Sequence, residues 1–245
     1  YLLSLDLYFL HLTFELYLFL IINLSIFNSR KIIFKNFVYK DNFKVPNNNI
    51  LINILLAASL TLFLELAIIR IHSIYIHIFS FFKNISLFSC FFGLGIGYAI
   101  GNRKLFSLKW TYPLLCIQIL FLYIVYSTPL NIFFINPVSE QLTMGRDTAQ
   151  GFFHIFLIYF FTISIFLFNV LIFIPLGQLT SSLMLKTNKL KAYGSNLIGS
   201  LFGILLITFL SYIETPPILW LSFSLFIFII LIRNNLNIIL VSSIS

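Results

Sequence analysis

Seven stretches of the chain are almost entirely apolar, and most are as long as a helix needs to be to cross a lipid bilayer. A spanning helix takes roughly 20 mainly apolar residues, whereas the strands of a membrane barrel alternate apolar and polar residues over about ten positions. Because the apolar runs are long and unbroken, the pattern predicts an all-α, polytopic transmembrane helix bundle. The predicted spans cover residues 2–27, 50–72, 85–100, 108–127, 152–176, 193–212 and 217–232.

The two ends of the chain depart from this pattern. The first predicted span contains three ionisable residues, and it has neither the basic start nor the small-residue cleavage site of a signal peptide. These residues are Asp6, His11 and Glu15. We interpret residues 1–49 as a polar-marked helix with a basic loop, and residues 50–233 as the multi-pass membrane domain. The tail, residues 234–245, is apolar from Leu236 onward but too short to span, and we expect it to begin a strand of a soluble domain.

The composition agrees with a lipid environment. The 245 residues are 60% hydrophobic and 9% charged, whereas a soluble domain has about 45–50% apolar and about 25% charged residues. This excludes an ordinary soluble enzyme, a disordered chain and a disulfide-stapled fold. Cys90 and Cys116 both lie in apolar runs, so we expect free thiols. The net charge of +8 does not indicate a nucleic-acid partner, because the basic residues lie between the spans.

Basic and non-basic loops alternate along the chain. The basic segments are 28–49, 101–109, 177–192 and Arg233, and the segments that hold few basic residues are 73–84, 128–151 and 213–216. Cytoplasmic loops of membrane proteins carry the excess of Lys and Arg. The alternation therefore predicts an N-terminus outside and a C-terminus on the cytoplasmic or matrix side. We interpret the membrane as a bacterial or an organelle inner membrane.

Two charged residues, Glu65 and Arg70, lie inside the second predicted span. A charge at mid-bilayer costs roughly 2.5–3.5 kcal/mol, so Glu65 is expected to be neutral, paired with another helix or facing a wet cavity. Five residues turn a helix by about 140° net, so the two side chains are not expected to pair with each other. They are interpreted either as structural anchors or as the polar lining of a site for a substrate or lipid head group.

Further polar residues interrupt the apolar runs. Asn84, Gln178 and Asn196 join those two residues as intramembrane polar candidates. Asn196 needs a hydrogen-bond partner if it is buried. His72 and His77 are interpreted as interfacial, because their spacing does not place them on one helix face and no further metal ligands lie near them.

Small residues predict close helix crossings in two spans. Those of the third span are Gly93, Gly95 and Gly97, and those of the sixth, spaced by four, are Ser195, Gly199 and Gly203. Pro175 is expected to break or kink the end of the fifth span. Residues 214–217 are expected to form a stiff turn that restarts a helix.

The sequence contains no Ser/His/Asp set, phosphate-binding loop or Cys/His cluster. Each of these would be needed to assign nucleophilic, nucleotide or metal chemistry. We therefore assign no catalytic, metal or cofactor-binding residue and expect no cofactor in this chain.

Six short blocks, in order, resemble the multi-pass membrane domain of bacterial spermidine-synthase-like proteins. They are residues 62–70, 82–87, 92–97, 174–178, 192–203 and 215–217 with Trp220. In that family the membrane domain precedes a cytosolic Rossmann-type domain that transfers an aminopropyl group to putrescine. The resemblance implies a membrane module that anchors or serves an aminopropyltransferase-type or methyltransferase-type activity, whose catalytic residues lie in the soluble part.

Two other function classes remain open. One is a transporter for a small polar or cationic solute such as a polyamine, with Glu65 as the cation contact and Asn84 and Asn196 along the path. The absence of an obvious inverted repeat argues against it, because many transporter folds have one. The other is a structural subunit that packs against other membrane subunits.

Overall fold

Long apolar helices form the whole of the described structure. The computed structural model describes residues 50–76, 79, 83–101, 108–127 and 152–242. Every regular element in these ranges is helical, so the all-α prediction is confirmed for them. The elements are α2 (Ile50–Tyr75), α4 (Lys83–Ile100), η3 (Leu108–Trp110), α5 (Thr111–Ser127), α8 (Phe152–Met184), α9 (Lys189–Tyr212) and α10 (Pro217–Ser242).

Four of these helices are long and apolar enough to cross a membrane: α2, α4, α8 and α9. Helix α5 and the first part of α10, Pro217–Leu231, are shorter apolar helices. Together they account for six of the predicted spans, while the first predicted span lies outside the described residues. The count of seven spans is therefore not confirmed.

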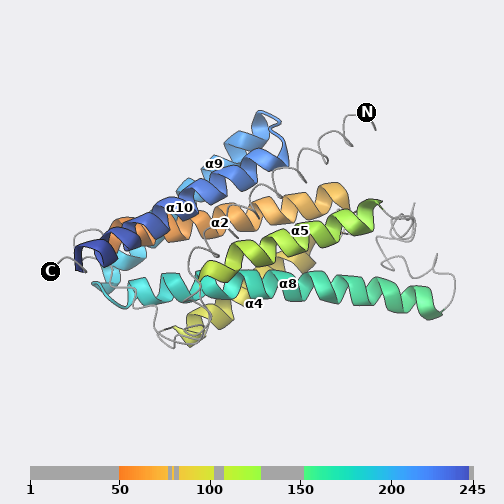
Figure 1. Cartoon of the computed structure of the whole chain (residues 1–245), viewed down its shortest axis with the longest axis horizontal. Helices are drawn as coiled ribbons and strands as arrows, with labels where there is room; N and C mark the ends of the chain where they lie inside the picture. Colours follow the sequence, from red (N-terminus) through yellow and green to blue (C-terminus); the bar gives the residue numbers. More distant parts are fainter. Residues whose placement is uncertain (1–49, 77–78, 80–82, 102–107, 128–151, 243–245) are drawn as a thin grey trace.

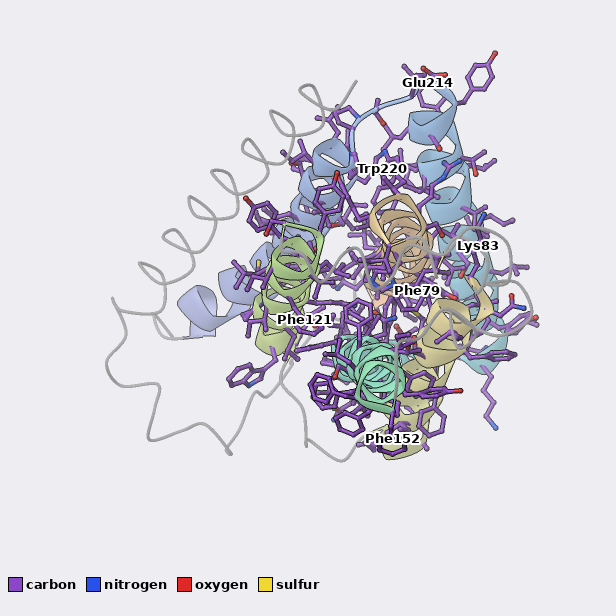
Figure 2. All side chains as sticks on the ribbon, turned by 90° about the vertical axis from the view of Figure 1, so that its right-hand side faces the viewer. Phe79, Lys83, Phe121, Phe152, Glu214 and Trp220 are labelled. Carbon is purple, nitrogen blue, oxygen red and sulfur yellow. The ribbon has the colours of Figure 1, made fainter. Side chains whose placement is uncertain are left out.

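Successive helices run in alternate directions along the bundle (Figure 1). The helices that pack most closely are not neighbours in sequence: α4 lies beside α8, and α2 lies beside α9. Both pairs run parallel. Gly93 and Gly97 of α4 meet Val170 and Ile174 of α8 in the same order, and the glycines of α9 likewise meet Leu55 and then Ser59 of α2. Figure 2 looks along the bundle and shows α2 near its centre, surrounded by other helices.

Glycines determine how closely the α4–α8 pair packs. A methyl group added at Gly93 would lie 2.5 Å from the carbonyl oxygen of Val170, and one at Gly177 would lie 2.6 Å from that of Leu94. Gly97 presses on Ile174 in the same way, whereas Gly95 meets nothing within 4 Å. Small residues let two backbones approach this closely in a membrane.

The α2–α9 pair uses the same device. A methyl group at Gly199 would overlap the backbone of Leu55, and one at Gly203 would overlap the carbonyl of Ser59. Ser195, one turn before Gly199, is partly buried. The close helix crossing predicted from the four-residue spacing is therefore present at Gly199 and Gly203.

The structure corrects two local expectations. The break expected as one outcome at Pro175 does not occur, because α8 continues to Met184; the alternative, a kink, stays a prediction. Helices inside a membrane tolerate proline when neighbouring helices hold the backbone, and α4 packs against α8 at Ile174 and Gly177, on either side of the proline. The tail also does not begin a strand up to Ser242, since α10 runs to that residue with no Pro or Gly after Pro217 to interrupt it.

The connection between α9 and α10 forms the tight turn that was expected. Glu214 adopts a positive φ of 56°, and Thr215 closes the turn by donating its backbone N–H and its side-chain hydroxyl to the carbonyl of Leu210. Pro217 then starts α10, a position that suits proline because its missing N–H is not needed there.

The polarity of the bundle is that of a membrane protein. The outer faces of α8 and α9 carry exposed Phe, Leu and Ile side chains, such as Phe152, Phe160, Leu205 and Phe209, and Figure 2 shows Phe152 at the rim of the bundle. The buried positions, in contrast, include charged and amide side chains. Apolar residues outside and polar residues inside indicate a lipid bilayer as the surroundings of these helices.

Candidate functional site

Five polar side chains from four helices meet in the core. His72 comes from α2, Ser86 and Ser89 from α4, Gln118 from α5 and Asn169 from α8, and each is at most 1% exposed. We call these residues the core network. They are brought together because α2, α4 and α5 each pack against α8.

Hydrogen bonds connect all five members of the core network. Asn169 donates through Nδ2 to Ser89 Oγ at 2.8 Å, and Gln118 donates through Nε2 to Asn169 Oδ1 at 2.7 Å. The Nε2 of Gln118 also lies 3.0 Å from Nε2 of His72, while His72 Nδ1 lies 2.8 Å from Ser86 Oγ. Ser89 Oγ donates to the carbonyl of Ser86 at 2.7 Å.

The bonding pattern determines the role of the His72 ring. An amide nitrogen only donates, so Nε2 of His72 must accept from Gln118. Nδ1 then carries the proton and donates to Ser86. The imidazole is therefore neutral. It donates its proton to the serine hydroxyl and cannot accept the serine's proton at the same nitrogen. The pair therefore lacks the nucleophile–base arrangement of a hydrolase.

Aromatic rings cover the histidine end of the core network. The ring of Phe79 lies 5.3 Å from that of His72, and Phe161 of α8 lies 6.2 Å from Phe79. Phe121 of α5 completes the group, 5.6 Å from Phe161. Figure 2 shows Phe79 among the helices and Phe121 on α5. These apolar rings surround the polar groups and lower the local dielectric constant, which strengthens the hydrogen bonds among them.

Glu65 lies on the same side of α2 as His72, seven residues earlier. Seven residues make two helical turns to within about 20°. Glu65 is 2% exposed, and its Oε2 has no hydrogen-bond partner among the described residues. Both Cys90 and Cys116 are free and buried, as expected.

The structure separates Glu65 from Arg70. Arg70 is exposed, and its guanidinium carbon lies 5.8 Å from the centre of the Trp220 ring. Trp220 is held in turn by an indole N–H donated to Thr215 Oγ1 at 2.8 Å. Arg70 is thus placed by an aromatic ring of α10, on a different face from the carboxylate.

The other sequence candidates do not gather around Glu65. Asn84 is exposed in the first turn of α4, and Asn196 is half-buried on α9. Gln178 is buried on α8, with its backbone beside Gly97. The sequence candidates therefore occupy separate places in the fold, with Glu65 two helical turns before His72 of the core network on α2.

Most of the core network was not identified from the sequence. His72, which was interpreted as interfacial, is buried and hydrogen-bonded inside the bundle. Its depth in the membrane stays a prediction, and His77 lies outside the described residues. Ser86, Ser89, Gln118 and Asn169 were missed. The signal for Gln118 and Asn169 was an amide inside an otherwise apolar span, since such residues commonly hydrogen-bond across helices.

Among the residues that the structure describes, no group of three or more His, Cys, Asp or Glu side chains is arranged to hold a metal ion. Comparison of the chain with protein-family models, with curated proteins and with solved structures gave no match.

Proposed function

We propose that the chain is the membrane module of a spermidine-synthase-like protein, which anchors or serves a soluble transferase-type domain. The observation that carries this proposal is the tight packing at the sequence blocks of the resemblance. The glycines of three blocks, including Gly97, Gly177 and Gly199, form the two closest helix contacts. Closely packed glycine pairs combined with a paired polar core make a rigid support, which is what an anchoring module requires.

The arrangement of the helix ends supports a cytoplasmic C-terminus. Helix α10 runs back toward the end of the bundle where α8 ends and α9 begins (Figure 1). The connection between those two helices carries Lys186, and the first turn of α9 carries Lys189 and Lys191, whereas the α9–α10 turn at the opposite end carries Glu214. Basic connections belong on the cytoplasmic side.

The first test concerns this orientation. We expect a Lys189→Cys variant to react with a membrane-impermeant maleimide only after the cells are permeabilised, and a Glu214→Cys variant to react in intact cells. Both positions are exposed, so the two variants control for each other. The opposite labelling pattern would place the C-terminal end of α10 outside and would remove the basis for a cytosolic partner domain.

The second test concerns the transferase. We expect the natural gene to continue beyond codon 245, or to lie beside a second gene, with a strand and a Gly-rich cofactor loop of a Rossmann-type domain. Loss of aminopropyl transfer from membranes of a deletion strain, restored by the whole locus, would support the assignment. A locus without any such domain would refute it.

A carrier for a small polar or cationic solute is the second candidate function. It is favoured by the buried Glu65, because a carboxylate inside a bundle commonly marks an ion or substrate pathway. Uptake of labelled monovalent cations and diamines into vesicles that contain the chain is the measurement. A Glu65→Gln variant should lose uptake, while a variant of the exposed Glu214 to Gln should retain it; equal uptake by both would contradict this candidate.

A further inference from the structure

Glu65 lies deep inside the bundle. Along α2 it is about 22 Å from the first residue and about 15 Å from the last, from a rise of 1.5 Å per residue. Helices α4, α8, α9 and α10 all pack against α2. The carboxyl group therefore lies within the hydrocarbon layer, which is about 30 Å thick, and it is screened from lipid by protein.

No positive side chain among the described residues compensates this carboxylate. Arg70, five residues along α2, lies over Trp220. The imidazole of His72 is neutral and is bonded on both nitrogens, to Ser86 and Gln118. On the helices packed against α2, Lys83 lies at the start of α4, and Lys189 and Lys191 lie at the start of α9, all of them exposed. The buried thiol of Cys90 on α4 supplies no positive charge in either protonation state.

A buried carboxylate without a partner is expensive in a membrane. An isolated charge in a low-dielectric interior costs several kcal/mol even after relaxation. The cost is removed when one positive charge is delivered to Oε2. Two sources of that charge are available in principle, a proton and a metal cation.

The surroundings favour the proton. A hard metal cation needs several oxygen ligands, typically six or more for Ca²⁺ and Mg²⁺. Among the described residues, no group of three or more His, Cys, Asp or Glu side chains gathers around Glu65 to complete such a ligand set. A proton, in contrast, needs only one lone pair of the carboxylate.

We infer that Glu65 is an intramembrane proton-binding site, and that its carboxyl group exchanges a proton while the core network beside it stays fully hydrogen-bonded. The inference goes beyond the anchoring module proposed above, because an anchor does not need a protonated acid. It also does not require that the chain carries any solute.

The test uses dicyclohexylcarbodiimide, an apolar reagent, on the purified full chain in lipid vesicles. A protonated carboxyl group adds across the C=N bond of the reagent, the carboxylate oxygen attacking the central carbon and the proton going to nitrogen. The O-acylisourea that forms rearranges to a stable N-acylurea without a leaving group. Mass spectrometry of peptides then locates the adduct.

We expect an adduct on Glu65 that decreases as the pH is raised at constant salt and that does not change with Na⁺ or K⁺. In a Glu65→Gln variant, the amount of adduct on this peptide should be at least tenfold lower than in the unmodified chain. Absence of the adduct in the unmodified chain would overturn the inference. Protection by Na⁺ or K⁺ at constant pH would overturn it as well, because it would assign a metal cation to the site.

Infrared spectroscopy gives a second readout that does not depend on the reagent. The difference between the spectra of the unmodified chain and Glu65→Gln should contain the carbonyl band of a protonated carboxylic acid at neutral pH. A carboxylate band in its place would contradict the inference. A Glu214→Gln variant is the matched control, because Glu214 is exposed and should contribute a carboxylate band.

Discussion

Replacing Gln118 by leucine tests how far the core network holds the bundle together. The Nε2 of Gln118 lies within hydrogen-bond distance of both His72 and Asn169. This single change therefore removes the two side-chain hydrogen bonds by which Gln118 links α5 to α2 and to α8. Leucine keeps the size and the helix propensity of the side chain nearly the same. The loss of stability is therefore attributable to hydrogen bonding.

The expected magnitude follows from these two bonds. A hydrogen bond between membrane helices contributes about 0.6 kcal/mol on average and up to about 1.7 kcal/mol. Two of them amount to about 1–3 kcal/mol, and the same range follows for leaving a buried polar group unsatisfied. We expect the Gln118→Leu variant to lose about 1–3 kcal/mol of unfolding free energy.

The assay is reversible unfolding in mixed micelles of detergent and sodium dodecyl sulfate, followed by circular dichroism. The control is Thr208→Val on the exposed face of α9, where the hydroxyl bonds only to its own helix at Ile204; its effect should stay within about 0.5 kcal/mol. A cycle that combines Gln118→Leu with Asn169→Leu should be non-additive, since the two residues share a bond. A Gln118→Leu variant as stable as the unmodified chain, with additive double-mutant energies, would refute the reasoning.

Three further substitutions test the packing around α2 and α4. A Gly97→Ala variant should lose about 1–3 kcal/mol of unfolding free energy in the same assay, because its methyl group would overlap Ile174. The control Gly95→Ala places its methyl group in open space and should be neutral or up to about 1 kcal/mol more stable. Equal effects of the two variants would contradict the glycine contact. Replacing Arg70 by methionine should cost only about 0.5–1 kcal/mol, the value of an exposed cation–π contact with Trp220, and a much larger loss would indicate a buried partner for Arg70.

The hydrophobic pattern predicted the helices well because a helix in lipid must satisfy its own backbone. Six apolar runs correspond to described helices, and the restart at Pro217 was placed correctly. The continuation of α8 past Pro175 was not predicted, because proline is unfavourable in an isolated helix. In the structure, contact with α4 holds the chain on both sides of this proline. Local propensity could not reveal a contact with a helix far away in the sequence.

The contents of the site could be predicted only in part, for a related reason. Hydropathy marks a polar residue inside a span but does not say which way it faces. Glu65 was singled out and is buried, whereas Asn84, chosen on similar grounds, is exposed. Among the glycines, Gly95 faces open space and its neighbours at 93 and 97 touch α8. Facing depends on which helices become neighbours, and this is set by the tertiary arrangement.

The parallel pairing of α2 with α9 and of α4 with α8 has a consequence for biogenesis. Parallel neighbours cannot form as a hairpin while the chain is being threaded into the bilayer. The glycine surface of α4 therefore has no partner until α8 has been inserted, and the surface of α2 at Leu55 and Ser59 waits for the glycines of α9. During synthesis, these surfaces stay without the helix that covers them in the folded bundle. If synthesis stopped before α8, the inserted helices α2 and α4 would therefore lack the close contacts that they make with α9 and α8 in the folded bundle.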